Sequence, residues 1–147
     1  MKFEIKRSGF PINIGKLEFF FGTSVEELTR FFEVQDEIEE KIQPLMDARE
    51  KLTKNKGNAT SDDVKELIYV SNQLNTIQYD ALLGDGSYEK IYSEHPDAIQ
   101  LFDLFDLIAE NVSEALENDA KDREDKLSER RANLIKKKAL KNKKNKK

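Results

Sequence analysis

The alternation of apolar and polar residues predicts two short strands at the start of the chain, within residues 2–21. Phe3 and Ile5 alternate with charged residues, which is the period-two pattern of a strand with one buried face. Ser8 and Gly9 are typical turn residues, so we expect the chain to reverse there. Gly15 is a candidate bulge within the second strand. That strand is indicated by the apolar residues Ile12, Ile14, Leu17, Phe19 and Phe21.

After Gly22 the apolar spacing changes to three and four, which predicts a long helix. Ser24 followed by Glu27 has the spacing of a capping box, in which each side chain bonds one free backbone N–H of the first turn. Pro44 lacks an N–H and clashes with the preceding turn, so we expect a kink or a break near residues 40–44. The expected core-facing stripe is Leu28, Phe31, Gln35, Ile38, Ile42 and Leu45 or Met46.

A second helix is predicted over about residues 61–83. Thr60 and Asp63 form another start signal, and Gly84 is suited to the position just past the helix end. The residues expected to face the core are Val64, Leu67, Ile68, Leu74, Ile77 and Ala81.

The next segment predicts a short helix and then a long one. Ser87 is expected to cap a helix of one to two turns, and Pro96 to be the first residue of the third main helix, with Asp97 in its first turn. His95 precedes a proline and should therefore lie at a boundary. Ile99 and Leu107 fall on the acidic face of the long helix. Its expected core seam is Leu101, Phe105, Ile108, Val112 and Ala115.

These segments predict a mainly α fold (α+β minor), with three main helices plus a short helix, a small N-terminal β-hairpin and a disordered basic C-terminal tail. Residues 1–120 are expected to form the helical domain, and residues 121–147 a charged tail, helical or disordered. The tail holds 13 basic and 4 acidic residues, which gives a net charge of +9. Residues 1–120 hold 12 basic and 25 acidic residues, which gives a net charge of −13. Lysine blocks repel each other and carry little apolar area to bury.

Composition excludes several kinds of chemistry. The absence of cysteine removes disulfides, thiol nucleophiles and thiolate metal sites. His95 is the only histidine, and no Gly-x-Ser-x-Gly motif is present to supply a serine nucleophile for it. Residues 84–89 (GDGSYE) lack the ladder of acidic ligands of a calcium loop. No apolar run reaches the length of a membrane span. We therefore expect no enzymatic activity, no metal, no cofactor and no membrane partner.

The basic tail raises the question of nucleic acid. Its eight lysines between residues 136 and 147 could neutralise phosphates. However, no aromatic residues alternate with them for base stacking, and residues 1–120 are acidic. We therefore expect a solubilising or partner-docking extension rather than a nucleic-acid-binding one. The alternative function is a basic-tailed nucleic-acid-binding or scaffold adaptor protein.

Unassigned apolar residues favour protein–protein interaction. Aromatic residues without an assigned core position (Phe19, Phe20, Phe21, Tyr88 and Tyr92) fit a chain that buries surface on a partner, although a single aromatic residue of this kind more often closes the core, here under the hairpin. The predicted contact surface consists of Tyr88, Tyr92, Ile99, Phe102 and Leu107.

A pattern of small and apolar residues extends this interpretation over residues 1–117. It comprises Leu83-Gly84, the segment Glu89-Lys90-Ile91-Tyr92, a polar turn at residues 93–96 and a helix rich in Leu and Phe over residues 101–108. Together with Phe21-Gly22 before an acidic capped helix, it resembles the tail assembly chaperones of phages and prophages of Gram-positive bacteria. The resemblance implies a chaperone of the host cytoplasm that keeps the tape measure protein soluble during tail tube assembly. It also implies the tail tube protein as a second partner. The seam of the long helix could in addition support self-association, although a seam of that length could equally pack within the chain.

Overall fold

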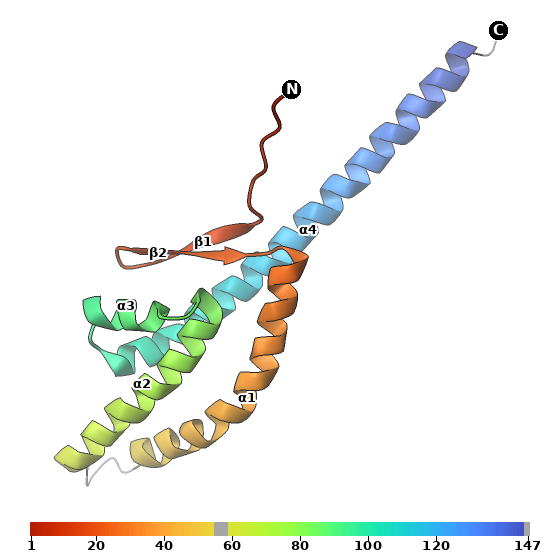
Figure 1. The fold of residues 1–147 in the computed structure, drawn as a ribbon. Helices are drawn as coiled ribbons and strands as arrows, with labels where there is room; N and C mark the ends of the chain where they lie inside the picture. The colour runs from red at the N-terminus through yellow and green to blue at the C-terminus, as the bar shows by residue number, and fades with distance from the viewer. Residues whose placement is uncertain (55–58, 146–147) are drawn as a thin grey trace. The chain divides into compact units, whose positions relative to one another are not determined.

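Two strands and four helices follow one another along the residues described by the structure, a computed structural model that covers residues 1–54 and 59–145 (Figure 1). The predicted mainly α class with a small N-terminal hairpin is confirmed. The chain divides into two units, residues 1–107 and residues 108–147, and each is described on its own. The elements are β1 (Gly9–Ile14), β2 (Leu17–Gly22), α1 (Val25–Lys54), α2 (Ser61–Leu83), α3 (Ser87–Glu94) and α4 (Ala98–Asn145).

The hairpin turns at Gly15-Lys16 rather than at Ser8-Gly9, so the prediction for this turn was wrong. Residues 1–7, predicted to contain a strand, lie outside the sheet and are exposed. Gly15 is not a bulge: it has a φ of +59° and occupies the first position of a two-residue loop. A type II′ turn reserves this position for glycine, and its twist matches that of the flanking strands.

The register of β1 and β2 sorts the side chains onto two faces. Phe10 pairs with Phe21, and the next pairs on that face are Ile12 with Phe19 and Ile14 with Leu17, which places six apolar side chains on one face. Ile14 and Phe21 are buried there. The hairpin packs on the helices through β2, which contacts α2.

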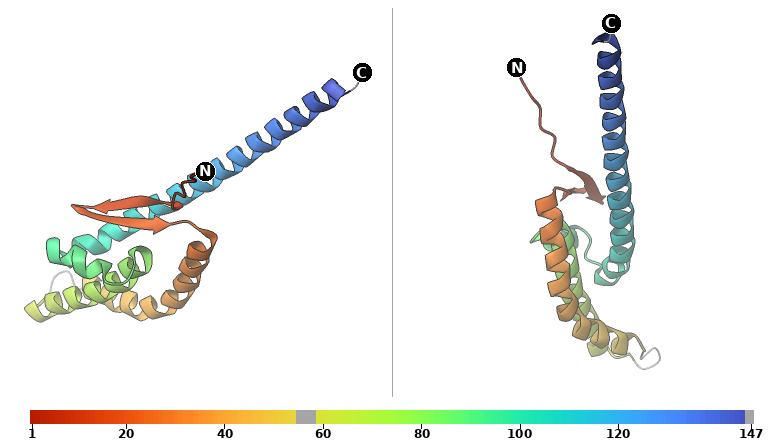
Figure 2. Two further views of the ribbon diagram at one scale, coloured as in Figure 1. Left: turned by 45° about the horizontal axis from the view of Figure 1, so that its top comes forward. Right: turned by 90° about the vertical axis from the view of Figure 1, so that its right-hand side faces the viewer.

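α1 is continuous through Pro44, so no break occurs there. The helix curves instead (Figures 1 and 2), which is the expected response to a residue that removes one backbone hydrogen bond. No residue of α1 is fully buried, and its predicted stripe is half-buried. At its start, the Glu27 N–H donates to Ser24 Oγ at 3.1 Å, which is one half of the predicted capping box.

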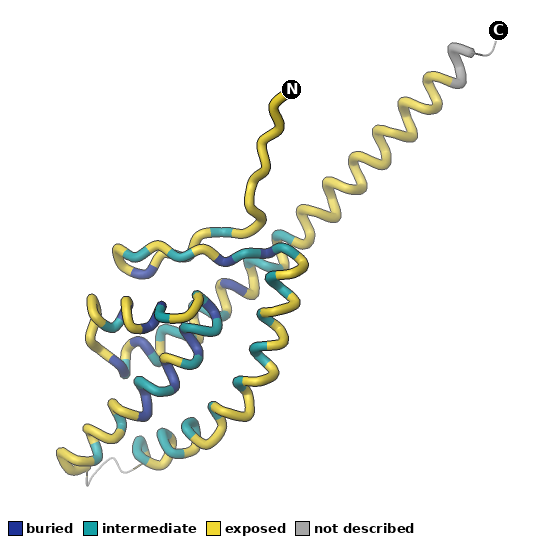
Figure 3. Tube along the Cα trace, in the orientation of Figure 1, coloured by how far each residue is buried: buried dark blue, intermediate teal, exposed yellow. Residues whose placement is uncertain are grey.

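α2 has the predicted bounds and provides most of the buried residues (Figure 3). The capping box of Thr60 and Asp63 is complete, with bonds of 3.1 and 3.2 Å. Val64 and Ile68 were expected in the core but are exposed, because burial begins only at the third turn of the helix. The buried residues repeat every four positions in two adjacent rows: Val70, Ser71, Leu74, Asn75, Gln78, Tyr79 and Leu82.

A buried polar cluster joins α2 to α3 and to the first turn of α4. The side-chain amide of Asn75 donates to the Tyr88 hydroxyl and to the Ala98 carbonyl, both at 2.9 Å. The Tyr88 hydroxyl in turn donates to Asn72 Oδ1 at 2.6 Å, and the Tyr79 hydroxyl donates to the carbonyl of Leu101. This cluster fixes the angle at which the three helices meet.

The starts of α3 and α4 differ from the prediction by one or two residues. Ser87 is the first helical residue of α3 rather than its cap, and the N-cap position is occupied by Gly86, which has no side chain to form a capping bond. Asp80 of α2 caps this helix instead, by accepting from the Tyr88 N–H at 3.0 Å. α4 begins at Ala98, and Asp97 precedes it and accepts from the Gln100 N–H. His95 ends α3, as predicted for a boundary residue.

α4 continues through the basic tail to Asn145, and residues 121–141 are exposed along their whole length. A helix without buried contacts gains little over an open chain in water, so the helical and disordered forms expected for the tail are close in free energy. No helix among the described residues combines the length and the apolar character that a bilayer crossing requires.

Candidate functional site

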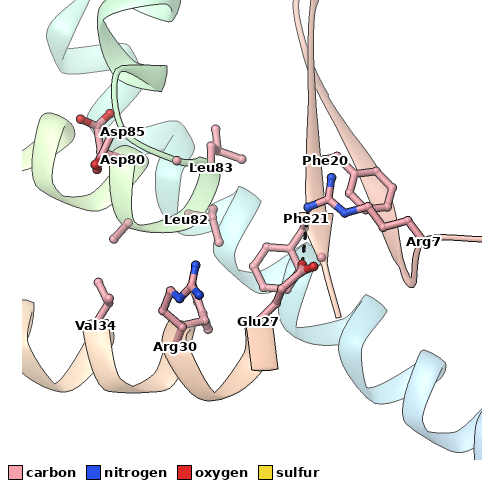
Figure 4. Close-up of a pocket in the computed structure, with 14 residues that line it drawn as sticks. Arg7, Phe20, Phe21, Glu27, Arg30, Val34, Asp80, Leu82, Leu83 and Asp85 are labelled. Atoms are coloured by element: carbon pink, nitrogen blue, oxygen red, sulfur yellow. Dashed lines mark ion pairs between the residues drawn. The ribbon is translucent and has the colours of Figure 1, made fainter. Parts of the chain in front are cut away.

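A cleft of about 550 Å³ opens in residues 1–107, between the end of β2, the first turns of α1 and the last turn of α2 (Figure 4). Its lining comes from three separate segments of the chain. The lining residues are Arg7, Phe20, Phe21, Gly22, Glu27, Arg30, Phe31, Val34, Asp80, Ala81, Leu82, Leu83, Gly84 and Asp85.

The floor of the cleft is apolar and rigidly packed. Phe21 is 4% exposed and lies between two rings, stacked on Phe10 at 5.4 Å and edge-on to Phe31 at 5.2 Å between ring centroids. Leu82, which is also buried, lines the cleft from α2. Aromatic contacts of this kind add to the free energy of burial and hold the rings in place. The floor is therefore preformed.

The rim nearest the hairpin is charged. The Arg7 guanidinium lies 4.4 Å from the Phe20 ring centroid and 3.6 Å from a Glu27 carboxylate oxygen. Both charged side chains are substantially exposed, so the pair contributes little to stability. A Cβ at Gly22 would overlap the Glu27 carboxylate, so a larger residue there would displace that side chain. Arg7 is thus held between a ring and a carboxylate at the edge of the cleft.

The opposite rim is formed by the end of α2. Asp80 and Asp85 lie there, while Leu83 extends from the last helical turn (Figure 4). Arg30 and Val34, one turn apart on α1, point into the space between the two helices (Figure 4). The cleft therefore has an apolar interior with charges of both signs around its mouth.

This arrangement suits the binding of apolar groups. The ionisable side chains of the lining are those of Arg7, Glu27, Arg30, Asp80 and Asp85. Among residues 1–54 and 59–145 no group of three His, Cys, Asp or Glu side chains could hold a metal ion. Apolar clefts with a few polar groups at the edge are typical sites for apolar side chains of a ligand.

The shifted pKa values lie in the buried polar cluster rather than in the cleft. Burial raises the pKa of Tyr79 well above its usual value, and the nearby Tyr88 and Asp106 raise it further. Burial also raises the pKa of Tyr88, against a lowering effect of its hydrogen bond with Asn75. Both hydroxyls are therefore neutral, structural donors at physiological pH.

Two of the predicted contact residues, Tyr88 and Tyr92, lie together on α3 with their rings stacked at 5.8 Å. They border a shallower hollow of about 380 Å³ with Asn72 and Thr76. Tyr88 is only 3% exposed and its hydroxyl is bonded within the cluster, so little of it is accessible to a partner. Tyr92 is half-buried.

The other three predicted contact residues are on α4. Ile99 is half-buried, and Phe102 is half-buried with the Arg49 guanidinium 3.7 Å above its ring. Leu107 is 53% exposed and is the most accessible of the five. None of the five lines the cleft.

The cleft residues Arg30, Val34 and Leu83 were missed because no sequence pattern connects them. Two signals did point to the region. In the run of Phe19, Phe20 and Phe21, a strand must place the middle ring on the opposite face from its neighbours. The three consecutive apolar residues at 81–83 also exceed what a single helical stripe needs.

Comparisons of the chain with protein-family models, with curated proteins and with solved structures find no match.

Proposed function

We propose that the protein is a non-enzymatic tail assembly chaperone that holds an apolar segment of the tape measure protein in the cleft of residues 1–107. The observation that carries the proposal is the cleft itself, in which the partly exposed side chains of Phe31, Val34 and Leu83 lie around a buried apolar floor and inside a ring of charges. The identity of the partner is inferred from the resemblance in residues 1–117, and the binding surface from the cleft.

The size of the cleft limits what it can take. A volume of about 550 Å³ lies within the range of small-ligand sites, so it accommodates a few side chains rather than a whole helix. Each Leu- or Phe-sized side chain that leaves water contributes roughly 1.5–3 kcal/mol, before the cost of ordering the segment. Such binding is reversible, as a chaperone that must release its partner requires.

The charge of the body supports the same role. Residues 1–120 have a net charge of −13, and like-charge repulsion between complexes opposes their aggregation. The chaperone would therefore cover the apolar segment and surround it with an acidic surface.

The test is co-expression of the full chain with the large tape measure protein from the same gene neighbourhood. The measurements are the soluble fraction of the partner and its co-purification with the chaperone. Val34→Glu places a charge in the apolar interior of the cleft. Binding of the partner would remove this carboxylate from water at a cost of more than about 1.4 kcal/mol, which corresponds to a factor of ten in affinity. Capture of the partner should therefore weaken at least tenfold. Leu83→Glu tests the opposite wall in the same way.

Val64→Glu is the matched control, because it makes the same substitution on an exposed helical valine outside the cleft. We expect this variant to capture the partner like the unmodified chain. Equal capture by all three variants, each folded by circular dichroism, would show that the cleft is not the binding surface. An unmodified chain that leaves the partner insoluble would overturn the chaperone function itself.

A further inference from the structure

The second unit of the chain carries a feature that the proposed function does not use, a row of basic side chains on one face of the tail helix. Lys126, Arg130, Lys137 and Lys141 follow one another at spacings of four, seven and four residues, with Leu134 completing the row. Residues at such spacings lie on one side of an α-helix. All of them are exposed.

The row is widened by its neighbours and kept free of acids. Arg131 and Lys138 each follow a member of the row and extend the basic face on one side. Between residues 126 and 141 the chain has seven basic residues and one acidic residue, Glu129, which lies beside the row, about 60° around the helix from Lys126 and about 100° from Arg130. Arg123 would extend the row but is paired with Asp119 at 3.3 Å, so we do not include it.

We propose that this basic row, Lys126 to Lys141, binds the phosphate backbone of double-stranded DNA without sequence specificity. The row spans about 22 Å at 1.5 Å per residue and presents a cation about once per turn. The major groove of B-form DNA admits an α-helix, and basic helices of DNA-binding proteins run along it. The sequence alone did not lead us to expect nucleic-acid binding; sorting the charges onto one face of an exposed helix changes that expectation.

Other polyanions fit the row less well. Single strands are bound by stacking on aromatic side chains, and residues 108–147 contain no aromatic residue. Duplex RNA has a major groove too deep and narrow for side chains to read. A membrane-surface helix needs its apolar residues on one face, whereas Leu127 and Leu134 lie on or beside the basic row and Ile135 and Leu140 lie away from it.

The test is a fluorescence anisotropy titration of a short labelled DNA duplex with the full-length chain at several salt concentrations. Four to six phosphate contacts predict a slope of log affinity against log salt of about −4 to −5. The double variant Arg130→Gln/Lys137→Gln should make this slope shallower by about 2 and weaken binding at least tenfold at about 0.1 M salt.

Lys121→Gln/Lys136→Gln is the matched control, because it removes the same charge from exposed positions on the other side of the helix. We expect it to change the slope by less than half as much. Equal losses in the two double variants would overturn the proposal, since diffuse charge rather than the row would then be responsible. Tighter binding to duplex RNA, to polyglutamate or to anionic vesicles than to DNA would overturn it as well.

Discussion

Asn75 shows how much a single buried polar residue contributes to this fold. Its amide joins α2 to α3 and α4 through two hydrogen bonds of 2.9 Å, although its Oδ1 has no partner among the described residues. We expect Asn75→Ala to lower the free energy of unfolding by about 2 kcal/mol, since both bonds are lost and a small cavity remains. Asn72→Ala should cost less, because Asn72 is half-buried. Urea denaturation with an unchanged m-value measures both.

The buried tyrosines predict a loss of stability at alkaline pH. The pKa of Tyr79 is raised in the folded state, so the folded chain holds this proton more tightly than the unfolded chain. The resulting stability is fully present below the unfolded pKa of about 10 and is lost as the pH rises above it. We expect Tyr79→Phe to be less stable at neutral pH, because the Leu101 carbonyl loses its donor. Its stability should decline less steeply above pH 10.

A stability that falls equally fast in both proteins above pH 10 would contradict this prediction. Tyr69→Phe is the control, because Tyr69 is 63% exposed and the same substitution removes no buried hydroxyl there. Denaturation at a series of pH values gives all three slopes.

At the residue scale, sequence reasoning succeeded where the interaction is local. Thr60 and Asp63 were predicted as a capping pair because their bonds span only three residues. Tyr88 was predicted at a partner surface and is buried, because its partners Asn72 and Asn75 lie on another helix. A buried asparagine carries no hydropathy signal, so contacts of this kind follow only from the tertiary arrangement.

At the scale of elements, the hairpin turn depends on one glycine. Gly15 has a φ of +59°, and a Cβ there would lie 2.6 Å from His95 Nε2. Gly15→Ala should therefore destabilise the protein by about 1–2 kcal/mol, from backbone strain and from the displaced ring. In the His95→Ala background the same substitution should cost less, since only the strain remains. An identical cost in both backgrounds would show that the His95 contact is energetically neutral.

The same hairpin explains why its turn was mispredicted. Both Ser8-Gly9 and Gly15-Lys16 are plausible turn pairs by composition. The observed turn at Gly15-Lys16 lets three apolar pairs share one face, with Pro11 paired opposite Phe20 on the other face. The position of the turn is therefore determined by the pairing register, which depends on both strands together. The helices were predicted more closely because their period is read from one segment alone.

At the scale of the molecule, the cleft could not be predicted from the sequence, because its lining extends from Arg7 to Asp85 through three segments. The basic row could be predicted, because the spacing of residues along an exposed helix alone determines which of them share a face. Sequence therefore constrains the second unit of this chain more than it constrains the binding surface of the first.

The two proposed activities should separate by salt and by mutation, because they rest on different forces in different units. Burial of an apolar segment in the cleft is nearly independent of ionic strength, whereas phosphate binding by Lys126 to Lys141 weakens steeply with salt. Raising the salt from about 0.05 to 0.2 M should thus release DNA and leave the captured partner bound. Val34→Glu should abolish capture and keep DNA binding, and Arg130→Gln/Lys137→Gln should do the reverse. Loss of both activities in either folded variant would contradict this separation.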